Sequence, residues 1–224
     1  MTAFFALIPA AGVGERAGTT VPKQYAPLLD KPMLLHTIAA FAAAPSITAT
    51  HVVVSPKDKW IETLGGSGFS TNCKIHRVGG ATRAGSVLNG LKAIDADKDD
   101  WVLVHDAARP CITPALIEAL ISALRDDKVG GLLALPVSDT VKRADSAGRV
   151  RETISRDGLW LAQTPQMFRY GVLHDALEQF PDMTDEAGAI ERIGLNPRLV
   201  TGSACNIKVT YLTDFDVAKS YLGR

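Results

Sequence analysis

A glycine-containing segment near the amino terminus places two cationic side chains beside backbone amides that can approach a phosphate group. Residues 9–17 read Pro-Ala-Ala-Gly-Val-Gly-Glu-Arg-Ala and follow directly on the apolar run 3–8. Glycine amides can come close to phosphate oxygens, and Arg16 and Lys23 add positive charge beside them. The segment predicts a triphosphate site, with a plain strand-to-helix turn carrying surface charges as the alternative.

The same segment also fits the dinucleotide-binding pattern G-x-G-x-x-A, which makes an NAD(P)-dependent oxidoreductase using Gly12, Gly14 and Ala17 a competing hypothesis. That pattern requires a continuous helix directly after the glycines. Gly18, Pro22 and Pro27 interrupt any such helix. The segment therefore favours an extended phosphate-binding loop, and titration with NADH would separate the two hypotheses.

A second candidate group, His105-Asp-Ala-Ala-Arg-Pro110, follows the apolar run 101–104. Ligands of open parallel sheets bind at the carboxyl ends of the strands. Asp106 is placed to hold Mg²⁺, which prefers one or two carboxylates together with substrate phosphates. The alternative is that Asp106 caps the following turn. A histidine ending an apolar strand is expected to be packed and hydrogen-bonded rather than catalytic, so His105 is not assigned to the reaction.

Short apolar runs that alternate with helical patterns must position these groups. Such alternation predicts an α/β fold with a mostly parallel sheet covered by helices on both faces. Thr113 and Pro114 predict a helix start, as N-cap and first helical residue. The expected strands are 3–8, 51–54, 74–78, 101–104, 132–135, 159–163 and 199–201, and the expected helices are 33–43, 83–94, one opened at 113, 172–180, 185–193 and one from about 214.

Residues 139–156 differ in character from the rest of the chain. Two polar, β-prone stretches flank the turn Ser146-Ala-Gly148 and predict a hairpin. An isolated two-stranded hairpin is only marginally stable in water. We therefore expect this arm to pack on something else, with a second subunit as a plausible partner.

Composition narrows the classes of protein. The 224 residues are 46% hydrophobic and carry 24 basic and 24 acidic side chains, so a single globular domain spanning 1–224 is expected. The balanced charge disfavours nucleic acid as a partner. Because no apolar run reaches about 18 residues, a membrane span is not expected. The start of the chain lacks a signal-peptide pattern, and the three cysteines form no metal-binding or disulfide pattern, so a cytoplasmic protein with reduced thiols is expected.

Six blocks of sequence are informative when taken together. They are Pro9-Ala-Ala-Gly-Val-Gly-Glu-Arg16, Pro22-Lys-Gln-Tyr25, His105-Asp-Ala-Ala-Arg-Pro110, Thr164-Pro-Gln166, Thr184-Asp-Glu-Ala187 and Asn206-Ile-Lys-Val-Thr210. Together they resemble the 2-C-methyl-D-erythritol 4-phosphate cytidylyltransferase family, nearly from end to end. The first two blocks are shared more widely among sugar-phosphate nucleotidylyltransferases, and their combination with the third and sixth is specific.

The resemblance implies a Rossmann-like core, a hairpin arm exchanged in a homodimer, and transfer of CMP from CTP to methylerythritol phosphate in the non-mevalonate isoprenoid precursor pathway. Asp106 is similar to the family's Mg²⁺ residue. The implied nucleotide-binding residues are Ala10, Ala11, Gly12, Gly14, Arg16, Lys23, Gly80, Ala81 and Ser86. The implied substrate-binding residues are Asp106, Arg109, Thr140, Arg156, Thr164 and Lys208, and the implied catalytic residues are Arg16, Lys23 and Lys208.

One departure concerns base recognition, because the family often carries an acidic residue where this chain has Ala81. Backbone groups of 10–12 and 80–81 can still face the N4 amino group and N3 of cytosine, and Ser86 could donate to O2. Two alternatives stay open beside the cytidylyltransferase. A related enzyme that acts on ribitol 5-phosphate shares much of the pattern, and a catalytically silent nucleotide-binding regulator would bind CTP without releasing pyrophosphate.

Overall fold

The computed structural model describes residues 2–12, 21–65 and 69–223. Its seven main strands are β1 (Phe4–Pro9), β4 (Ala49–Val53), β5 (Cys73–His76), β6 (Trp101–Val104), β7 (Gly130–Pro136), β10 (Trp160–Arg169) and β11 (Arg198–Thr201). Its helices are α1 (Met33–Ala42), α2 (Arg83–Lys92), α3 (Pro114–Leu124), α4 (Tyr170–Gln179), α5 (Glu186–Arg192) and α6 (Leu212–Leu222). The short pieces are the 3-10 turns η2 (Lys23–Tyr25) and η3 (Ile61–Leu64) and the strand pairs β2 (Pro27–Leu28) with β3 (Lys31–Pro32) and β8 (Val141–Ala144) with β9 (Val150–Ile154).

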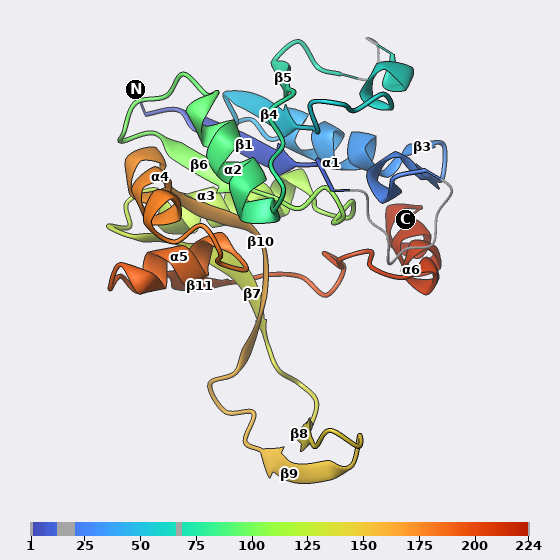
Figure 1. Ribbon diagram of the computed structural model, residues 1–224, viewed down its shortest axis with the longest axis vertical. Helices are drawn as coiled ribbons and strands as arrows, with labels where there is room; N and C mark the ends of the chain where they lie inside the picture. Colours follow the sequence, from blue (N-terminus) through green and yellow to red (C-terminus); the bar gives the residue numbers. More distant parts are fainter. Residues whose placement is uncertain (1, 13–20, 66–68, 224) are drawn as a thin grey trace.

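The seven main strands form one sheet in the order β11-β7-β10-β6-β1-β4-β5 (Figure 1). Every neighbouring pair is parallel except the two pairs made by β10, which runs antiparallel to both β6 and β7. The predicted α/β class and mostly parallel sheet are confirmed. The chain proceeds outward from β1 to β4 and β5 and then returns to the other side of β1 with β6. The order of strands therefore reverses between β1 and β6, where open sheets bind ligands.

Helices cover both faces of the sheet, because successive side chains of a strand point to opposite sides. Phe4, Ala6 and Ile8 of β1 pack in one buried cluster with residues of α1 and α3. Phe5 and Leu7 pack in a second cluster with residues of α2, α4 and α5. The wholly apolar sequence of β1 follows from burial on both faces.

Most helix and strand positions agree with the expectations. Thr113 caps α3, since its hydroxyl accepts a hydrogen bond from the Leu116 N–H at 3.2 Å, and Pro114 is the first helical residue. The strand expected at 159–163 was predicted too short, because β10 continues to Arg169. Its register with β7 shifts between Ala162 and Gln166. Pro165 lies within this irregular stretch of β10. A proline is tolerated there because its missing N–H costs no ladder hydrogen bond.

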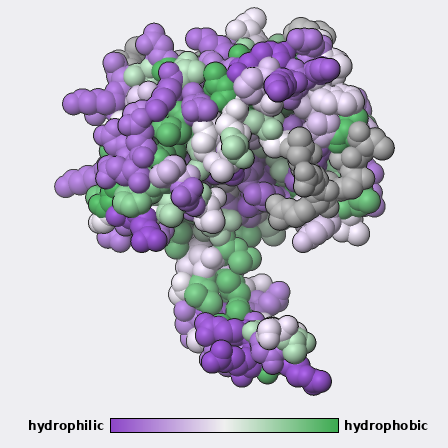
Figure 2. Space-filling view, in the orientation of Figure 1, coloured by the Kyte–Doolittle hydropathy of each residue, from purple (hydrophilic) through white to green (hydrophobic). Residues whose placement is uncertain are grey.

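The predicted hairpin is present as β8 and β9, paired antiparallel, and it projects from the body on a neck formed by the ends of β7 and β10 (Figure 1). Figure 2 shows apolar surface along the neck and polar surface at the far end. Leu159, Trp160 and Leu161 are 39%, 38% and 59% exposed, and Val150 on the arm is 66% exposed. An arm of this shape buries little of its own apolar surface within one chain.

The buried His51 on β4 gives a prediction about stability and pH. Its ring is 2% exposed and its Nδ1 lies 2.9 Å from Nε2 of His76. Burial, with smaller contributions from His76 and Lys74, lowers the pKa of His51 to about 4. Between pH 6.5 and 4 the unfolded chain therefore binds more protons at this position than the folded chain does.

The free energy of unfolding should fall as the pH drops through this window, by up to about 3 kcal/mol from His51 at about 1.4 kcal/mol per pKa unit. Urea unfolding of wild type and His51→Leu at pH 7, 5.5 and 4.5 would measure it. The variant should lose less stability than wild type on acidification. Parallel pH profiles would contradict the prediction.

Candidate active site

The start of the glycine loop is fixed by a side chain for which the sequence analysis proposed no role. Gln24, on η2, is buried, and its Nε2 donates to the carbonyls of Ala10 at 2.8 Å and Gly12 at 2.9 Å. The Ala10 N–H donates to the Val53 carbonyl at 2.7 Å, which continues the line of β1 beyond its last ladder pair. The only signal for Gln24 was its place in the block 22–25. Gly14 and Arg16 lie outside the described residues.

Two lysines connect the segment 206–210 to other parts of the site, Lys23 from η2 and Lys208 to the loop after β6. Lys23 Nζ donates to the Val209 carbonyl at 2.6 Å, and the Val209 N–H donates to the Ala108 carbonyl at 2.8 Å. Lys208 Nζ lies 2.7 Å from Oδ2 of Asp106. The structure thereby brings together Lys23 and Val209, which are 186 positions apart in the sequence.

Asp106 lies at the centre of a cluster of cations at the end of β6. Besides Lys208, Arg83 Nε lies 2.9 Å from Oδ1, and Arg109 Nε lies 3.8 Å from Oδ2. Burial alone would raise the pKa of Asp106, but Arg83, Lys208 and Arg109 together hold it well below its usual range. Asp106 is therefore ionised at neutral pH.

Arg83 also contacts Glu186, a pairing that no pattern in the sequence predicted. The guanidinium binds both carboxylate oxygens of Glu186, at 2.6 and 3.1 Å, and Glu186 is fully buried. Burial would lower the pKa of Arg83, but Glu186 and Asp106 raise it above its usual value. Three cations surround two carboxylates here, so the group carries a net positive charge that suits phosphate oxygens.

A buried hydrogen-bond network supports the backbone on both sides of Asp106. The Thr164 hydroxyl accepts from the Asp106 N–H at 3.1 Å and lies 3.0 Å from His105 Nδ1. Asn206 donates through Nδ2 to the Thr164 carbonyl at 2.8 Å, and Arg109 Nη1 donates to the Asn206 carbonyl at 2.7 Å. Burial lowers the pKa of His105 to about 4, so the ring is neutral at pH 7. The expectation of a packed, hydrogen-bonded His105 is confirmed.

Two adjoining cavities lie beside Asp106 and the glycine loop. The first, about 240 Å³, is lined by Lys23, Gln24, Asp106 and Lys208 among others, and the second, about 350 Å³, is lined by Gly80, Ala81, Thr82 and Ser86 among others. Pro9, Gly12 and Arg83 line both. A triphosphate and its nucleoside would fit across two adjoining cavities of this kind.

Ser86 fixes the loop that lines the second cavity. Its Oγ accepts from the Gly80 N–H at 3.0 Å and donates to the Thr82 carbonyl at 2.9 Å. The expected donation from Ser86 to a base would therefore require this internal bond to open. A side chain at Gly79 would place its Cβ 2.3 Å from the Ala11 Cβ, so the two loops meet only because residue 79 is glycine.

Thr140 and Arg156 lie on the arm, which Figure 1 shows projecting away from the body that carries Asp106. Arg156 Nη1 donates to the Ser138 carbonyl, at the base of the arm. The other predicted substrate-binding residues, Asp106, Arg109, Thr164 and Lys208, come together in one cluster. Arg109 donates to the Asn206 carbonyl, and the Thr164 hydroxyl accepts from the Asp106 N–H and so holds the Asp106 loop.

Asp106 fits a hard cation, with one condition. Its carboxylate is 9% exposed and lines the cavity, but Lys208 occupies Oδ2. The Lys208 side chain is 43% exposed, and the rotatable bonds of a lysine side chain allow it to give up this position. Within the described ranges no group of three or more His, Cys, Asp and Glu side chains is placed to hold a metal. A Mg²⁺ held by one carboxylate would take its other oxygens from phosphates and water.

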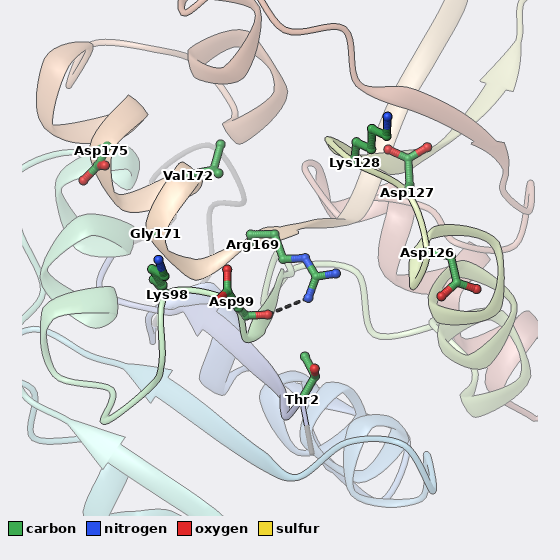
Figure 3. Close-up of a pocket in the computed structure, with 10 residues that line it drawn as sticks. All are labelled: Thr2, Lys98, Asp99, Asp126, Asp127, Lys128, Arg169, Gly171, Val172 and Asp175. Atoms are coloured by element: carbon green, nitrogen blue, oxygen red, sulfur yellow. Dashed lines mark hydrogen bonds between the residues drawn. The ribbon is translucent and has the colours of Figure 1, made fainter.

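A larger cavity, about 770 Å³, lies at the amino-terminal ends of β1, β6 and β7, between the segments that precede these strands (Figure 3). Arg169 projects into it and donates to the Asp99 carbonyl at 2.5 Å. The guanidinium also lies over the Trp101 ring, 3.9 Å from its centroid. Arg169 is thus occupied by structural contacts, and this cavity is separate from the Asp106 cluster.

The fold and site define the class of protein. A mostly parallel α/β sheet carries a glycine loop and an ionised carboxylate ringed by cations at the point where strand order reverses, an arrangement that suits the phosphates of a nucleotide. In the described part of the chain, no helix combines the length and the hydrophobicity that crossing a bilayer requires. This is the architecture of a nucleotide-binding α/β enzyme.

Comparisons with known proteins identify the family. The family described as 2-C-methyl-D-erythritol 4-phosphate cytidylyltransferase matches residues 4–224. Proteins of that name from Dechloromonas aromatica and Chromobacterium violaceum are each 53% identical, covering 99% and 97% of this chain and 98% and 96% of their own.

Solved structures agree with these relatives. A 4-diphosphocytidyl-2C-methyl-D-erythritol synthase is 39% identical with a TM-score of 0.88, covering 99% of both chains. The Francisella tularensis cytidylyltransferase is 35% identical with a TM-score of 0.84, covering 98% of this chain and 100% of that one. The chain belongs to the 2-C-methyl-D-erythritol 4-phosphate cytidylyltransferase family and is a nucleotidyltransferase.

Proposed function

We propose that this enzyme transfers CMP from CTP to 2-C-methyl-D-erythritol 4-phosphate and releases pyrophosphate, a step of the non-mevalonate isoprenoid precursor pathway. The observation that carries the proposal is the Asp106 cluster, in which Lys208, Arg83 and Arg109 surround one carboxylate beside the glycine loop. Its excess positive charge suits a reaction in which two phosphate-bearing substrates meet.

The chemistry needs positioning and charge stabilisation rather than a general base. The phosphate of the acceptor is largely dianionic at neutral pH, because its second pKa is about 6. One of its oxygens forms a bond to the α-phosphorus of CTP while the bond from that phosphorus to the pyrophosphate oxygen breaks. Lys23, Lys208 and Arg16 are proposed to stabilise the negative charge that develops, as cations do in phosphoryl transfers.

Mg²⁺ is the proposed cofactor, with Asp106 as its protein ligand. When bound, the ion would neutralise triphosphate charge and support the leaving pyrophosphate. The residues of this chain do the rest of the positioning. Asp106 is held on its loop by the Thr164 hydroxyl at 3.1 Å, and Lys208 is free to turn from Oδ2 toward phosphate oxygens once another cation takes its place.

The acceptor site is proposed to be completed by a second copy of the chain. Thr140 and Arg156 sit on the arm, and the neck of the arm exposes Leu159, Trp160 and Leu161. Apolar surface of this kind on a projecting element suits a homodimer contact. Exchange of the arms would deliver Thr140 and Arg156 to the partner's Asp106 cluster. The cytoplasm is the proposed compartment, which fits the unpaired thiols of Cys73, Cys111 and Cys205.

A pyrophosphate-release assay tests the activity. Purified chain with CTP and Mg²⁺ is offered methylerythritol phosphate, ribitol 5-phosphate, or no acceptor. Release with the first alone supports the proposal. Release with ribitol 5-phosphate alone would replace the acceptor, and CTP binding without any release would indicate a silent regulator.

Base choice gives a further prediction, because Ala81 offers no carboxylate to a base. The Ala10 and Gly12 carbonyls each accept one hydrogen bond from Gln24 and keep a second lone pair, so backbone groups of 10–12 and 80–81 are still expected to read cytosine. Backbone groups do not depend on the side chain at 81. CTP should be preferred over UTP by about a hundredfold or more in kcat/KM, because mispaired buried polar groups are costly. Steady-state kinetics with both nucleotides measures this, and comparable values would contradict backbone reading.

Ser86→Ala is expected to weaken the use of both nucleotides without reversing this preference. Loss of the Ser86 hydroxyl frees the Gly80 N–H that it holds at 3.0 Å, so the loop loses its position rather than its hydrogen-bonding groups. The same kinetics with the variant check this. A reversed preference would show that Ser86 itself distinguishes the bases.

A further inference from the structure

Glu186 is a fully buried carboxylate that the mechanism above does not use. It is the first residue of α5, and its two oxygens accept from Arg83 Nη1 at 2.6 Å and Nη2 at 3.1 Å. A buried charge is costly to keep unless it is paired. Arg83, the partner of Glu186, lines both cavities of the candidate site.

Arg83 joins Glu186 to Asp106. Its Nε donates to Asp106 Oδ1 at 2.9 Å while its two terminal nitrogens bind Glu186, so the guanidinium is held from two sides. A planar guanidinium bound in this way has little freedom to rotate. Because Oδ1 of Asp106 is fixed by Arg83, its Oδ2 is turned toward Lys208, which lies 2.7 Å away.

The start of α5 has anchors besides this ion pair. The Ala187 N–H donates to Gln166 Oε1 at 2.8 Å, and Gln166 Nε2 donates to Asp185 Oδ2 at 2.9 Å. Asp185 also caps the helix by accepting from the Gly188 N–H at 3.0 Å. These bonds anchor the start of α5 to β10 and to itself, so the helix has several anchors other than the Glu186 carboxylate.

We propose that Glu186 is a positioning residue for nucleotidyl transfer. It holds Arg83, and Arg83 in turn fixes the Asp106 carboxylate with one oxygen toward Arg83 and the other toward the cavity. Without the Glu186 charge, Arg83 would be free to turn its remaining donors onto Asp106 or onto phosphate oxygens, and the carboxylate would lose its single orientation. This inference rests on the proposed function.

The test begins with Glu186→Gln, which keeps the shape and removes the charge. The matched control is Glu178→Gln. Glu178, on α4, forms an ion pair with Lys92 of α2, whose Nζ lies 2.7 Å from Glu178 Oε1, but this pair is on the surface. We expect Glu186→Gln to lower kcat about tenfold to hundredfold while KM for CTP changes by less than about threefold. The control should keep wild-type kcat. Unchanged kcat in Glu186→Gln would overturn the proposal.

Double variants separate positioning from a structural role. In an Asp106→Asn background, Glu186→Gln should change kcat/KM by no more than about twofold, because the group it orients is already lost. In a Lys23→Ala background, it should cause its full loss. Equal losses in both backgrounds would overturn the proposal, because a general weakening of the fold acts in either one.

If Glu186→Gln folds poorly, Arg83→Met combined with Glu186→Leu replaces the buried pair by apolar side chains, which is often neutral for stability. This variant should unfold at about the wild-type temperature and still have lowered kcat. Wild-type kcat in it would overturn the proposal. Pyrophosphate release by the wild-type chain is measured first, so failure of the proposed function is recognised separately.

Discussion

Lys208→Ala is expected to lower kcat by about a hundredfold to a thousandfold, the range seen when one preorganised charge-stabilising donor is removed. Lys208 Nζ lies 2.7 Å from Asp106 and lines the same cavity. The positive charge of Lys208 can stabilise the negative charge that develops on the phosphoryl oxygens, and the substitution by alanine removes this positive charge. Lys23→Ala should act in the same direction, because Lys23 lines that cavity too. Single-turnover measurements at saturating substrates would give the chemical rate directly.

The matched control is Lys219→Ala, an exposed lysine of α6 that pairs with Asp216 at 2.9 Å. It should keep wild-type kcat, and all three variants should show wild-type circular dichroism. Lys208→Ala should also leave unfolding nearly unchanged, because the buried Asp106 carboxylate keeps Arg83 as an ion-pair partner at 2.9 Å. A folded Lys208→Ala enzyme with near-normal turnover would remove Lys208 from the catalytic residues.

Mixing two inactive variants is expected to restore activity, because each proposed site takes Arg156 from one chain and Asp106 from the other. Arg156→Ala leaves the Asp106 cluster intact, and Asp106→Asn leaves the arm intact. A heterodimer of the two would contain one site with both residues native. With random exchange of equal amounts, about a quarter of all sites should be active.

The experiment requires that exchange be verified, for example with chains of different mass. Each variant alone should have activity well below a quarter of wild type. The control mixture is Asp106→Asn with Lys208→Ala, both in the same cluster, which should restore none. No recovery after verified exchange would show that each site is built within one chain and that the arm carries no residue into its partner.

Local patterns in the sequence determined a large part of this protein. The apolar runs placed β1 and β6, since a strand buried on both faces leaves no polar positions. Thr113 and Pro114 marked the start of α3, because capping depends on neighbouring residues only. The glycine loop and Asp106 were found from their places after those strands, and the six blocks identified the family.

Tertiary structure alone decided which charges stand beside these groups. Arg83 meets Glu186 across 103 positions of sequence, and Lys23 meets Val209 across 186. The roles of Gln24 and Thr164 as supports of backbone loops likewise appear only when distant segments are packed together. No local pattern specifies such pairs, because they depend on strand order and on which helix covers which face. The sequence by itself determined the loops that carry the chemistry, and the packing of the sheet determined the electrostatic surroundings in which they act.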